Sequence, residues 1–407
     1  MIRTACDSLH LAMNLAAVFR RISPKLASGA QRQWESFEHT KGKQKMKKNK
    51  VKLVLGVIFV AACMLAVGIY KCRTSGRPEN GVRIGLVVAL TGNASGTGRP
   101  IANAVDFLRK KYPAAKFFVE DSKSTPVGGI QAVHKLIDVY GVNVVFCEMT
   151  NVSAAIADYT ERNKVVFIAP IILSDFVSRW KYTVRDFMTL DEQAKADLDE
   201  YEKNHSHDGT NLIAIVSNDE FGKSSLDGIQ KAIKGRGVKL IENLTFDSDS
   251  ELIKNVVINA LRNKPNVIFA SGFSPALGTL VKELRASGFD GYILTTTAFT
   301  APSIQTAAGD GLWRIIHADF ATTKVYDELA EWYSQKYAEK PTLTTFLCHD
   351  GVAVIMAASE MCKTNDSREL LDNLENVVVQ EGAYGNLSVR NREVKFKLTT
   401  NTIGNKK

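Results

Sequence analysis

Residues 82–90 (VRIGLVVAL), 91–98 (TGNASGTG) and 100–108 (PIANAVDFL) form the stretch that decides the fold. The first run is apolar and rich in β-branched residues, which predicts a buried strand. The second joins three glycines to hydroxyls and amides and predicts a loop. The third has apolar positions at helical spacing and predicts a helix that opens at Pro100. A strand, loop and helix are half of a βαβ unit, and open α/β sheets bind ligands at such loops.

The same strand–loop–helix unit is repeated along the chain, in two separate series. Strands are expected over 116–120, 142–147 and 165–169, and an irregular stretch over 171–180 leads to residues 182–187. A capping box at 189–192 (TLDE) then starts a helix towards residue 203. A second series places strands over 212–217, 238–242, 267–270 and 292–294. A strand over 311–320 then leads back to helices over 323–337 and 345–361, and a hairpin pairs 383–389 with 393–398. Strands that alternate with helices predict parallel sheets covered on both faces, so two series predict two lobes.

The predicted organisation divides the chain into five parts. Residues 1–45 carry no assigned fold, 46–72 are a basic flank and a hydrophobic segment, and 73–80 are a linker. The first lobe is expected to comprise residues 81–188 and 319–378, and the second lobe residues 189–318 and 379–400.

The net charge of +9 is confined to one end of the chain. Residues 1–52 hold twelve Lys and Arg against three acidic residues, and the remaining chain holds 40 basic and 40 acidic residues. No basic surface is left over for a polyanion, so nucleic acid is excluded as the expected partner. The positive charge belongs instead to membrane targeting.

Residues 53–70 (LVLGVIFVAACMLAVGIY) run for eighteen positions without a charge, directly after the basic stretch. One interpretation is an uncleaved transmembrane anchor with its basic flank in the cytoplasm. The other is a bacterial lipoprotein signal, because residues 60–63 (VAAC) resemble a lipobox with Cys63 as the lipidated residue. Both interpretations anchor the protein in the cell envelope and place residues 73–407 on the extracytoplasmic side of the membrane.

Motifs for catalysis or metal binding are absent from the sequence. The glycines at 96 and 98 lack the rest of a dinucleotide fingerprint, and there is no P-loop or G-x-S-x-G elbow. Cys147, Cys348 and Cys362 have no metal-ligand spacing, so buried free thiols are expected, with one disulfide as the alternative. We therefore expect no enzyme, catalytic residue, metal or cofactor.

Several segments, taken in order, resemble the type I periplasmic binding proteins, in the branch of the leucine/isoleucine/valine-binding proteins of ABC transporters. They are 84–98 (IGLVVALTGNASGTG), 119–121 (VED), 143–155, 168–170 (IAP), 218–222 (NDEFG), 265–272 (PNVIFASG) and 382–389 (GAYGNLSV). The resemblance covers about residues 81–398. It implies two Rossmann-like lobes joined by three crossing strands, which close on a small ligand.

Candidate ligand-binding residues follow the predicted strands. In the first lobe they are Thr97, Thr150, Asn151, Ser153 and Ser174, whose side chains suit a carboxylate or another acceptor-rich group; helix capping is the alternative role. In the second lobe Phe221 is expected to stack on the ligand, with Phe273 and Thr297 as further candidates. Glu148, Asp219 and Glu220 are expected to be solvated.

Three departures from the family pattern bear on the ligand. Thr97 stands where an aromatic residue is usual, residues 296–299 (TTAF) lack the acid that meets an amine, and Cys147 replaces a glycine. The expected ligand is therefore an uncharged or anionic small molecule, and plain aliphatic amino acids should bind weakly.

The leading functional hypothesis is a membrane-tethered solute-binding protein that serves an ABC-type importer, with permease and ATPase subunits as partners. The second is the ligand-sensing ectodomain of a signalling receptor, and the third is an enzyme on the same fold. A nearby set of permease and ATPase genes would distinguish the first two.

Overall fold

The computed structural model describes residues 81–170, 176–203, 205, 209–247 and 250–404. The segment at 53–70, Cys63 and Ser174 lie outside these residues, so the anchor, the lipid site and one candidate residue are not described. Among the described helices, none combines the length and the apolar character that crossing a membrane requires.

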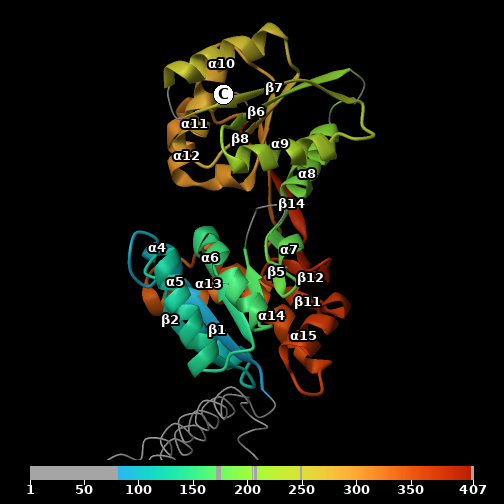
Figure 1. The fold of residues 1–407 in the computed structure, drawn as a ribbon. Coiled ribbons are helices and arrows are strands. Elements are labelled where there is room, and N and C mark those ends of the chain that lie inside the picture. Colours follow the sequence, from blue (N-terminus) through green and yellow to red (C-terminus); the bar gives the residue numbers. More distant parts are fainter. Residues whose placement is uncertain (1–80, 171–175, 204, 206–208, 248–249, 405–407) are drawn as a thin grey trace, which may run out of the picture. The chain divides into compact units, whose positions relative to one another are not determined.

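The first lobe is built on an eight-stranded sheet in the order β11-β12-β13-β5-β4-β3-β1-β2 (Figure 1). Strands β1 to β5 run parallel to one another, whereas β11, β12 and β13 pair antiparallel. The elements of this lobe are β1 (Arg83–Val88), α4 (Ser95–Lys111), β2 (Lys116–Asp121), α5 (Pro126–His134), η1 (Lys135–Val139), β3 (Val144–Cys147), α6 (Thr150–Arg162), β4 (Val166–Ala169), α7 (Phe176–Arg179), β5 (Thr183–Arg185), α13 (Lys324–Tyr337), α14 (Leu343–Glu360), α15 (Ser367–Asn373), η4 (Leu374–Asn376), β11 (Val378–Gly382), β12 (Gly385–Arg390) and β13 (Glu393–Lys395).

The second lobe is built on a six-stranded sheet in the order β14-β10-β9-β8-β6-β7. Its strands are parallel except for β14, which runs antiparallel to β10. Its elements are α8 (Leu190–Glu202), β6 (Thr210–Ser217), α9 (Glu220–Ala232), β7 (Val238–Phe246), α10 (Ser250–Arg262), β8 (Val267–Ser271), α11 (Pro275–Ala286), β9 (Tyr292–Thr295), η2 (Thr297–Thr300), α12 (Pro302–Ala308), η3 (Gly309–Gly311), β10 (Ile315–Phe320) and β14 (Leu398–Ile403).

Successive side chains of a central strand point to opposite faces of the sheet, and both faces are covered by helices. In β6, Leu212 and Ala214 pack with α8 and α9, whereas Ile213 and Ile215 pack with α10 and α11. Every residue from 212 to 216 is therefore buried, as expected for a parallel strand between two helical layers. The prediction of parallel sheets covered on both faces is confirmed.

The chain passes between the two sheets three times, after β5, after β10 and after β13. The crossing segments contact one another through aromatic rings. The ring centroids of Phe187 and Phe320 are 5.5 Å apart, and those of Phe320 and Phe396 are 5.0 Å apart. The three predicted crossings are thus present, and they share a small apolar core.

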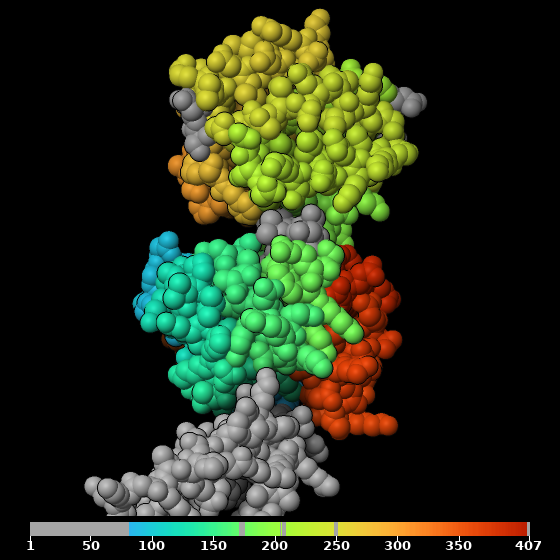
Figure 2. All heavy atoms as spheres, viewed as in Figure 1, coloured from blue at the N-terminus to red at the C-terminus, as the bar shows by residue number. Residues whose placement is uncertain are grey.

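The predicted boundary of the second lobe is wrong for residues 379–395. Strands β11, β12 and β13 belong to the first sheet, where Glu393 on β13 is paired with Arg185 on β5, and only β14 joins the second sheet. In Figure 2 the corresponding red atoms lie on the same body as the blue and cyan segments of the first lobe. The carboxyl group of Glu393 also lies 3.5 Å from the Arg185 guanidinium, which favours this edge for β13.

Two local predictions are corrected and one is confirmed. Helix α4 begins at Ser95 and not at Pro100, because the amides of Thr97 and Gly98 already donate to the Ala94 carbonyl. The strand expected to run to residue 398 ends at Lys395. The capping box is present: the Thr189 hydroxyl accepts from the Glu192 amide, and the Glu192 carboxylate accepts from the Thr189 amide.

Among the described cysteines, Cys147 and Cys348 are buried free thiols, and Cys362 is a half-buried one.

Candidate functional site

The carboxyl edge of the first sheet is organised by Asp121 at the end of β2. Its carboxylate accepts hydrogen bonds from the amides of Leu90, Thr91 and Lys123 and from the Thr91 hydroxyl. Burial alone would raise the pKa of Asp121, but these hydrogen bonds hold it below its ordinary value. The Asp121 carboxylate therefore holds the loop between β1 and α4 in place through these hydrogen bonds.

The first-lobe candidates separate into exposed and buried side chains. Thr150 and Asn151 are exposed in the first turn of α6, which lacks a side-chain cap, and Thr97 is exposed in the first turn of α4. The Thr97 hydroxyl donates to the Ala94 carbonyl, and the Asn151 side chain accepts from the Val152 amide.

Ser153 is different, because it is fully buried and its hydroxyl donates to the Cys147 carbonyl at 3.2 Å. This side chain joins α6 to β3 and does not present a group at the edge of the sheet. The alternative role, helix capping, is not observed either, because the N-cap residue of α6 is Met149.

Glu148, expected to be solvated, is buried at the end of β3 with 8% of its surface exposed. Its Oε1 accepts from the Ala89 amide at 2.8 Å, and its Oε2 has no hydrogen-bond partner among the described residues. Burial raises the pKa of Glu148 to about 7. A carboxyl group with a pKa near neutrality therefore lies at the end of β3, two residues before Thr150 in the chain, and the sequence pattern does not predict its burial.

An aromatic pair marks the carboxyl edge of the second sheet. Phe221 follows β6 and Phe273 follows β8, and these two strands are hydrogen-bonded neighbours. The two ring centroids lie 4.2 Å apart, and Phe273 is 56% exposed. The ring of Phe273 is therefore accessible at this edge, next to the half-buried ring of Phe221. The sequence predicted both residues, and the structure brings them together.

Asp219 and Glu220 beside this pair have structural roles. The Asp219 carboxylate caps α9 by accepting from the Gly222 amide at 2.8 Å and from the Ser217 hydroxyl at 2.8 Å. Glu220 pairs with Lys223 on the exposed face of the same helix. Neither carboxylate is buried, so the expectation that both are solvated is confirmed.

The segment after β9 offers buried hydroxyls and no acid. The hydroxyls of Thr295 and Thr296 are buried and have no hydrogen-bond partner among the described residues. The amide of Thr297 donates to the Gln193 side chain at 3.0 Å, and Thr297 itself is only 8% exposed. The backbone of Thr297 is thus held against α8 by this hydrogen bond.

The described edge of the first sheet presents hydrogen-bonding groups, and that of the second presents two aromatic rings; both kinds of group can contact a small molecule. Within the described ranges, no group of three or more His, Cys, Asp and Glu residues is placed to hold a metal ion.

Comparisons with known proteins connect this architecture to one family. A family model described as periplasmic binding protein matches residues 81–397. No curated protein sequence matches the chain.

Solved structures with a similar fold include three bacterial binding proteins. A leucine-binding protein from Thermotoga maritima is 20% identical with a TM-score of 0.63, and the alignment covers 80% of this chain and 96% of that one. A solute-binding protein of an ABC transporter from Rhodopseudomonas palustris, in complex with 3,4-dihydroxybenzoic acid, is 18% identical with a TM-score of 0.63 (80% and 93% covered). A leucine-, isoleucine-, valine-, threonine- and alanine-binding protein from Brucella ovis is 17% identical with a TM-score of 0.67 (79% and 89% covered).

Proposed function

The chain belongs to the periplasmic binding protein family, and we propose that it is the extracytoplasmic solute receptor of an ABC-type importer. The observation that supports this role most directly is the pairing of the half-buried Phe221 with the exposed Phe273 at the carboxyl edge of the second sheet. Ligands of open α/β sheets bind at that edge. In the proposed mechanism, a small molecule is captured between this aromatic pair and the polar edge of the first lobe.

The proposed ligand is a small uncharged or anionic molecule with a flat apolar part. Its apolar part packs on Phe221 and Phe273, and its acceptor groups meet Thr150 and Asn151 at the N-terminus of α6, where the N-cap residue provides no side-chain cap. Residues 295–299 supply no carboxylate for an ammonium group, so leucine and isoleucine should bind weakly. The dihydroxybenzoate in one similar structure is a ligand of this chemical kind.

Capture by two lobes requires a conformational change that the ligand stabilises. Contacts made by both lobes exist only in the closed form, so the ligand shifts the population towards that form. Small-angle scattering of residues 73–407 should therefore show a smaller radius of gyration once a tight ligand is added. An unchanged radius with a saturating ligand contradicts capture between the lobes.

A ligand screen by thermal shift tests the proposed class. The panel contains leucine, isoleucine, 3,4-dihydroxybenzoate and related aromatic acids. A ligand at a hundred times its Kd adds about 2.7 kcal/mol of stability, so a true ligand gives a clear shift. A large shift with leucine and none with aromatic acids would overturn the proposed ligand class while leaving the receptor role in place.

The proposed tether is either residues 53–70 as an uncleaved anchor or a lipid on Cys63. If Cys63 is lipidated, the mature protein begins there, and Cys63→Ser leaves an unprocessed precursor. Mass spectrometry of membrane-extracted protein distinguishes the two, because peptides from residues 46–62 persist only with the uncleaved anchor.

A further inference from the structure

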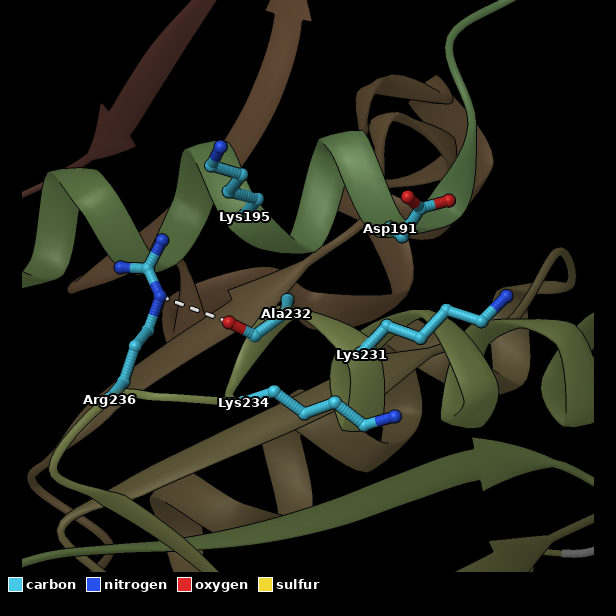
Figure 3. A pocket seen from close by; sticks show the side chains of 6 residues that line it. All are labelled: Asp191, Lys195, Lys231, Ala232, Lys234 and Arg236. Carbon is cyan, nitrogen blue, oxygen red and sulfur yellow. Dashed lines mark hydrogen bonds between the residues drawn. The ribbon is translucent and has the colours of Figure 1, made fainter.

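Figure 3 shows a hollow of about 240 Å³ between α8 and α9, which carries several cationic side chains. The ammonium group of Lys195 points away from those of Lys231 and Lys234, so the three lysines do not converge on one ligand. The Arg236 side chain already donates to the carbonyl of Ala232. This hollow therefore defines no partner, whereas an edge of the first sheet does.

Strand β2 lies at that edge, and one side of its backbone faces away from the sheet. In the described part of the chain β2 pairs only with β1, in a register that runs without interruption over all six of its residues. The Lys116 amide donates to the Val82 carbonyl, which fixes the alternation along the strand. The even-numbered residues thus turn their amides and carbonyls towards β1, and Phe117 and Val119 turn theirs outward.

Three side chains share the face of β2 that η1 covers, because alternate residues of a strand point to the same side. They are Lys116, Phe118 and Glu120. The Phe118 ring stacks on Tyr140 with the ring centroids 4.9 Å apart, and Glu120 Oε1 lies 2.8 Å from Lys135 Nζ. Lys116 is exposed, and it forms no ion pair with the residues that the structure describes.

The order of these three residues, a cation, a ring and an anion, is complementary to itself. If two copies of β2 run antiparallel about a two-fold axis at Phe118, that ring faces its own copy and Lys116 faces Glu120 of the second copy. Aromatic pairs and pairs of opposite charge stabilise neighbouring strands when they lie directly opposite each other. The same alignment sets Phe117 opposite Val119, so the outward amides and carbonyls of both residues are paired as well.

The other edge strands of the two described sheets lack this combination. The pairing of β7 and that of β11 each contain a register shift, which interrupts the row of backbone groups. Strand β14 has no charged residue that could select an alignment. Charged side chains on an edge can also serve to prevent pairing, but that role needs like charges to meet, and in β2 opposite charges meet.

One side chain already contacts the outer side of β2. Arg109 Nη2 on α4 donates to the Phe117 carbonyl at 3.3 Å. A carbonyl oxygen has two lone pairs, so this contact leaves one of them for an amide of another strand. The Arg109 side chain is 54% exposed, so it is free to move aside.

We propose that β2 is a homodimer interface, at which a second copy of this chain pairs antiparallel about a two-fold axis at Phe118. The eight-stranded sheet then continues from one copy into the other, in a symmetric contact of the commonest oligomer class. Lys135 occupies Oε1 of Glu120, and Lys116 of the second copy approaches Oε2. Solute takes no part in this contact, so the copies associate without one.

Sedimentation velocity of the detergent-solubilised full chain, without solute, tests the association. One strand pair is a small interface, so we expect a dimer with a Kd of about 100 µM or lower. A protein that stays monomeric up to about 500 µM overturns the proposal.

A charge exchange tests the alignment. Lys116→Glu and Glu120→Lys should each weaken the dimer at least about fivefold, because two symmetric attractive pairs become repulsive. The double variant Lys116→Glu/Glu120→Lys should recover the parent affinity within about twofold, since opposite charges face each other again. It does not restore the contact of residue 120 with Lys135, so recovery cannot arise from that contact. No recovery overturns the proposal, as does an equal loss in Lys340→Glu, a control at an exposed lysine in the first lobe.

A disulfide trap tests the position of the axis in the full chain. In a pair that is not hydrogen-bonded, opposite Cα atoms lie about 4.5 Å apart, which a disulfide spans. Phe118→Cys should therefore form a covalent dimer under mild oxidation, beyond the level that the native cysteines give in the parent. Lys164→Cys, at an exposed position elsewhere in the first lobe, should stay at the parent level. Equal yields of covalent dimer from the two cysteine variants would overturn the proposed axis.

Discussion

The Oε1 atom of Glu148 accepts a hydrogen bond from the Ala89 amide at 2.8 Å, which joins the carboxyl ends of β3 and β1 beneath the proposed solute site. The second oxygen of the same carboxyl group is buried without a hydrogen-bond partner in the described part of the chain. The Oε1 atom therefore links the two strand ends, whereas the buried Oε2 atom has a desolvation cost that no hydrogen bond offsets.

The first prediction concerns the pH dependence of stability. Burial raises the pKa of Glu148 from its ordinary value of 4.5 to about 7. As the pH rises, the unfolded chain loses this proton before the folded protein does. The contribution of Glu148 to the free energy of unfolding is therefore greatest below about pH 4.5 and falls as the pH rises towards 7. The loss from this one group is on the order of 3 kcal/mol, at about 1.4 kcal/mol for each pKa unit.

Glu148→Gln should remove that fall in stability. Its amide oxygen can still accept from Ala89, but it carries no titrating proton. Urea denaturation between pH 4.5 and pH 7 should show a shallower decline for Glu148→Gln than for the parent, and the exposed Glu339→Gln should decline as the parent does. Parallel declines in all three proteins would contradict the assignment.

The second prediction compares one substitution at two neighbouring buried acids. Asp186 is fully buried with no hydrogen-bond partner for either oxygen among the described residues, and burial together with Asp350 raises its pKa well above the ordinary value. Asp350 instead accepts from the amides of Ala383 and Tyr384, at 2.6 Å and 2.9 Å, and its Oδ1 lies 2.8 Å from His349 Nδ1.

Asp186→Asn is expected to raise the free energy of unfolding at pH 7, because it removes a buried carboxyl group whose charged form is disfavoured in the folded state. Asp350→Asn should destabilise it by about 1–3 kcal/mol, because one backbone amide loses its acceptor. The gain from Asp186→Asn should disappear below the ordinary pKa of an aspartate, where the unfolded chain is protonated as well. Equilibrium denaturation at pH 7 and near pH 3.5 measures the stability of both variants. A lower stability of Asp186→Asn than of the parent at pH 7 would contradict the interpretation of Asp186 as a buried, unpaired acid.

The third prediction tests the aromatic pair. Phe221→Ala and Phe273→Ala should each weaken ligand binding by roughly ten- to a hundredfold, the value of burying a Phe side chain. The melting temperature of the Phe273 variant should change little, because the side chain is 56% exposed. Leu252→Ala provides the control, since Leu252 is 50% exposed in the same lobe and lies on α10. Equal affinities for the ligand in the parent and both Phe variants would exclude the pair from the site.

The sequence was sufficient for most of the fold because the strands are buried on both faces. A run such as 212–216 is apolar throughout, and the helices on either side carry a clear period, so the two sheets could be predicted with their order of elements. The assignment of 379–395 failed for a different reason. A terminal hairpin joins the sheet edge where its residues find partners, and these partners are distant in the sequence. Here Glu393 contacts Arg185, and Asp350 contacts residues 383 and 384.

The candidate site shows the same limit. Phe221 and Phe273 could be predicted as aromatic residues in polar loops after apolar strands, and their pairing then followed from the adjacency of β6 and β8. The burial of Glu148 could not be predicted, because an acidic residue after a strand normally faces water. Its burial results from packing in the folded first lobe, where both Glu148 and Asp186 raise the pKa of Cys348 on α14 in addition to burial. No local pattern in the sequence records such a contact.

The last prediction concerns two glycines in the stretch that decides the fold. A Cβ atom on Gly98 would lie 2.4 Å from both the amide nitrogen and the carbonyl oxygen of Ala89, which are backbone atoms that cannot rotate away. Gly96, two residues earlier in α4, has open space around the same position. Gly98→Ala should therefore lower the free energy of unfolding by more than about 3 kcal/mol, through backbone overpacking at the end of β1. Gly96→Ala should raise it by about 0.4–1 kcal/mol, because alanine restricts the unfolded chain and favours the helix. Urea denaturation of the two variants beside the parent decides the point, and similar effects of both substitutions would contradict the close approach of α4 to Ala89.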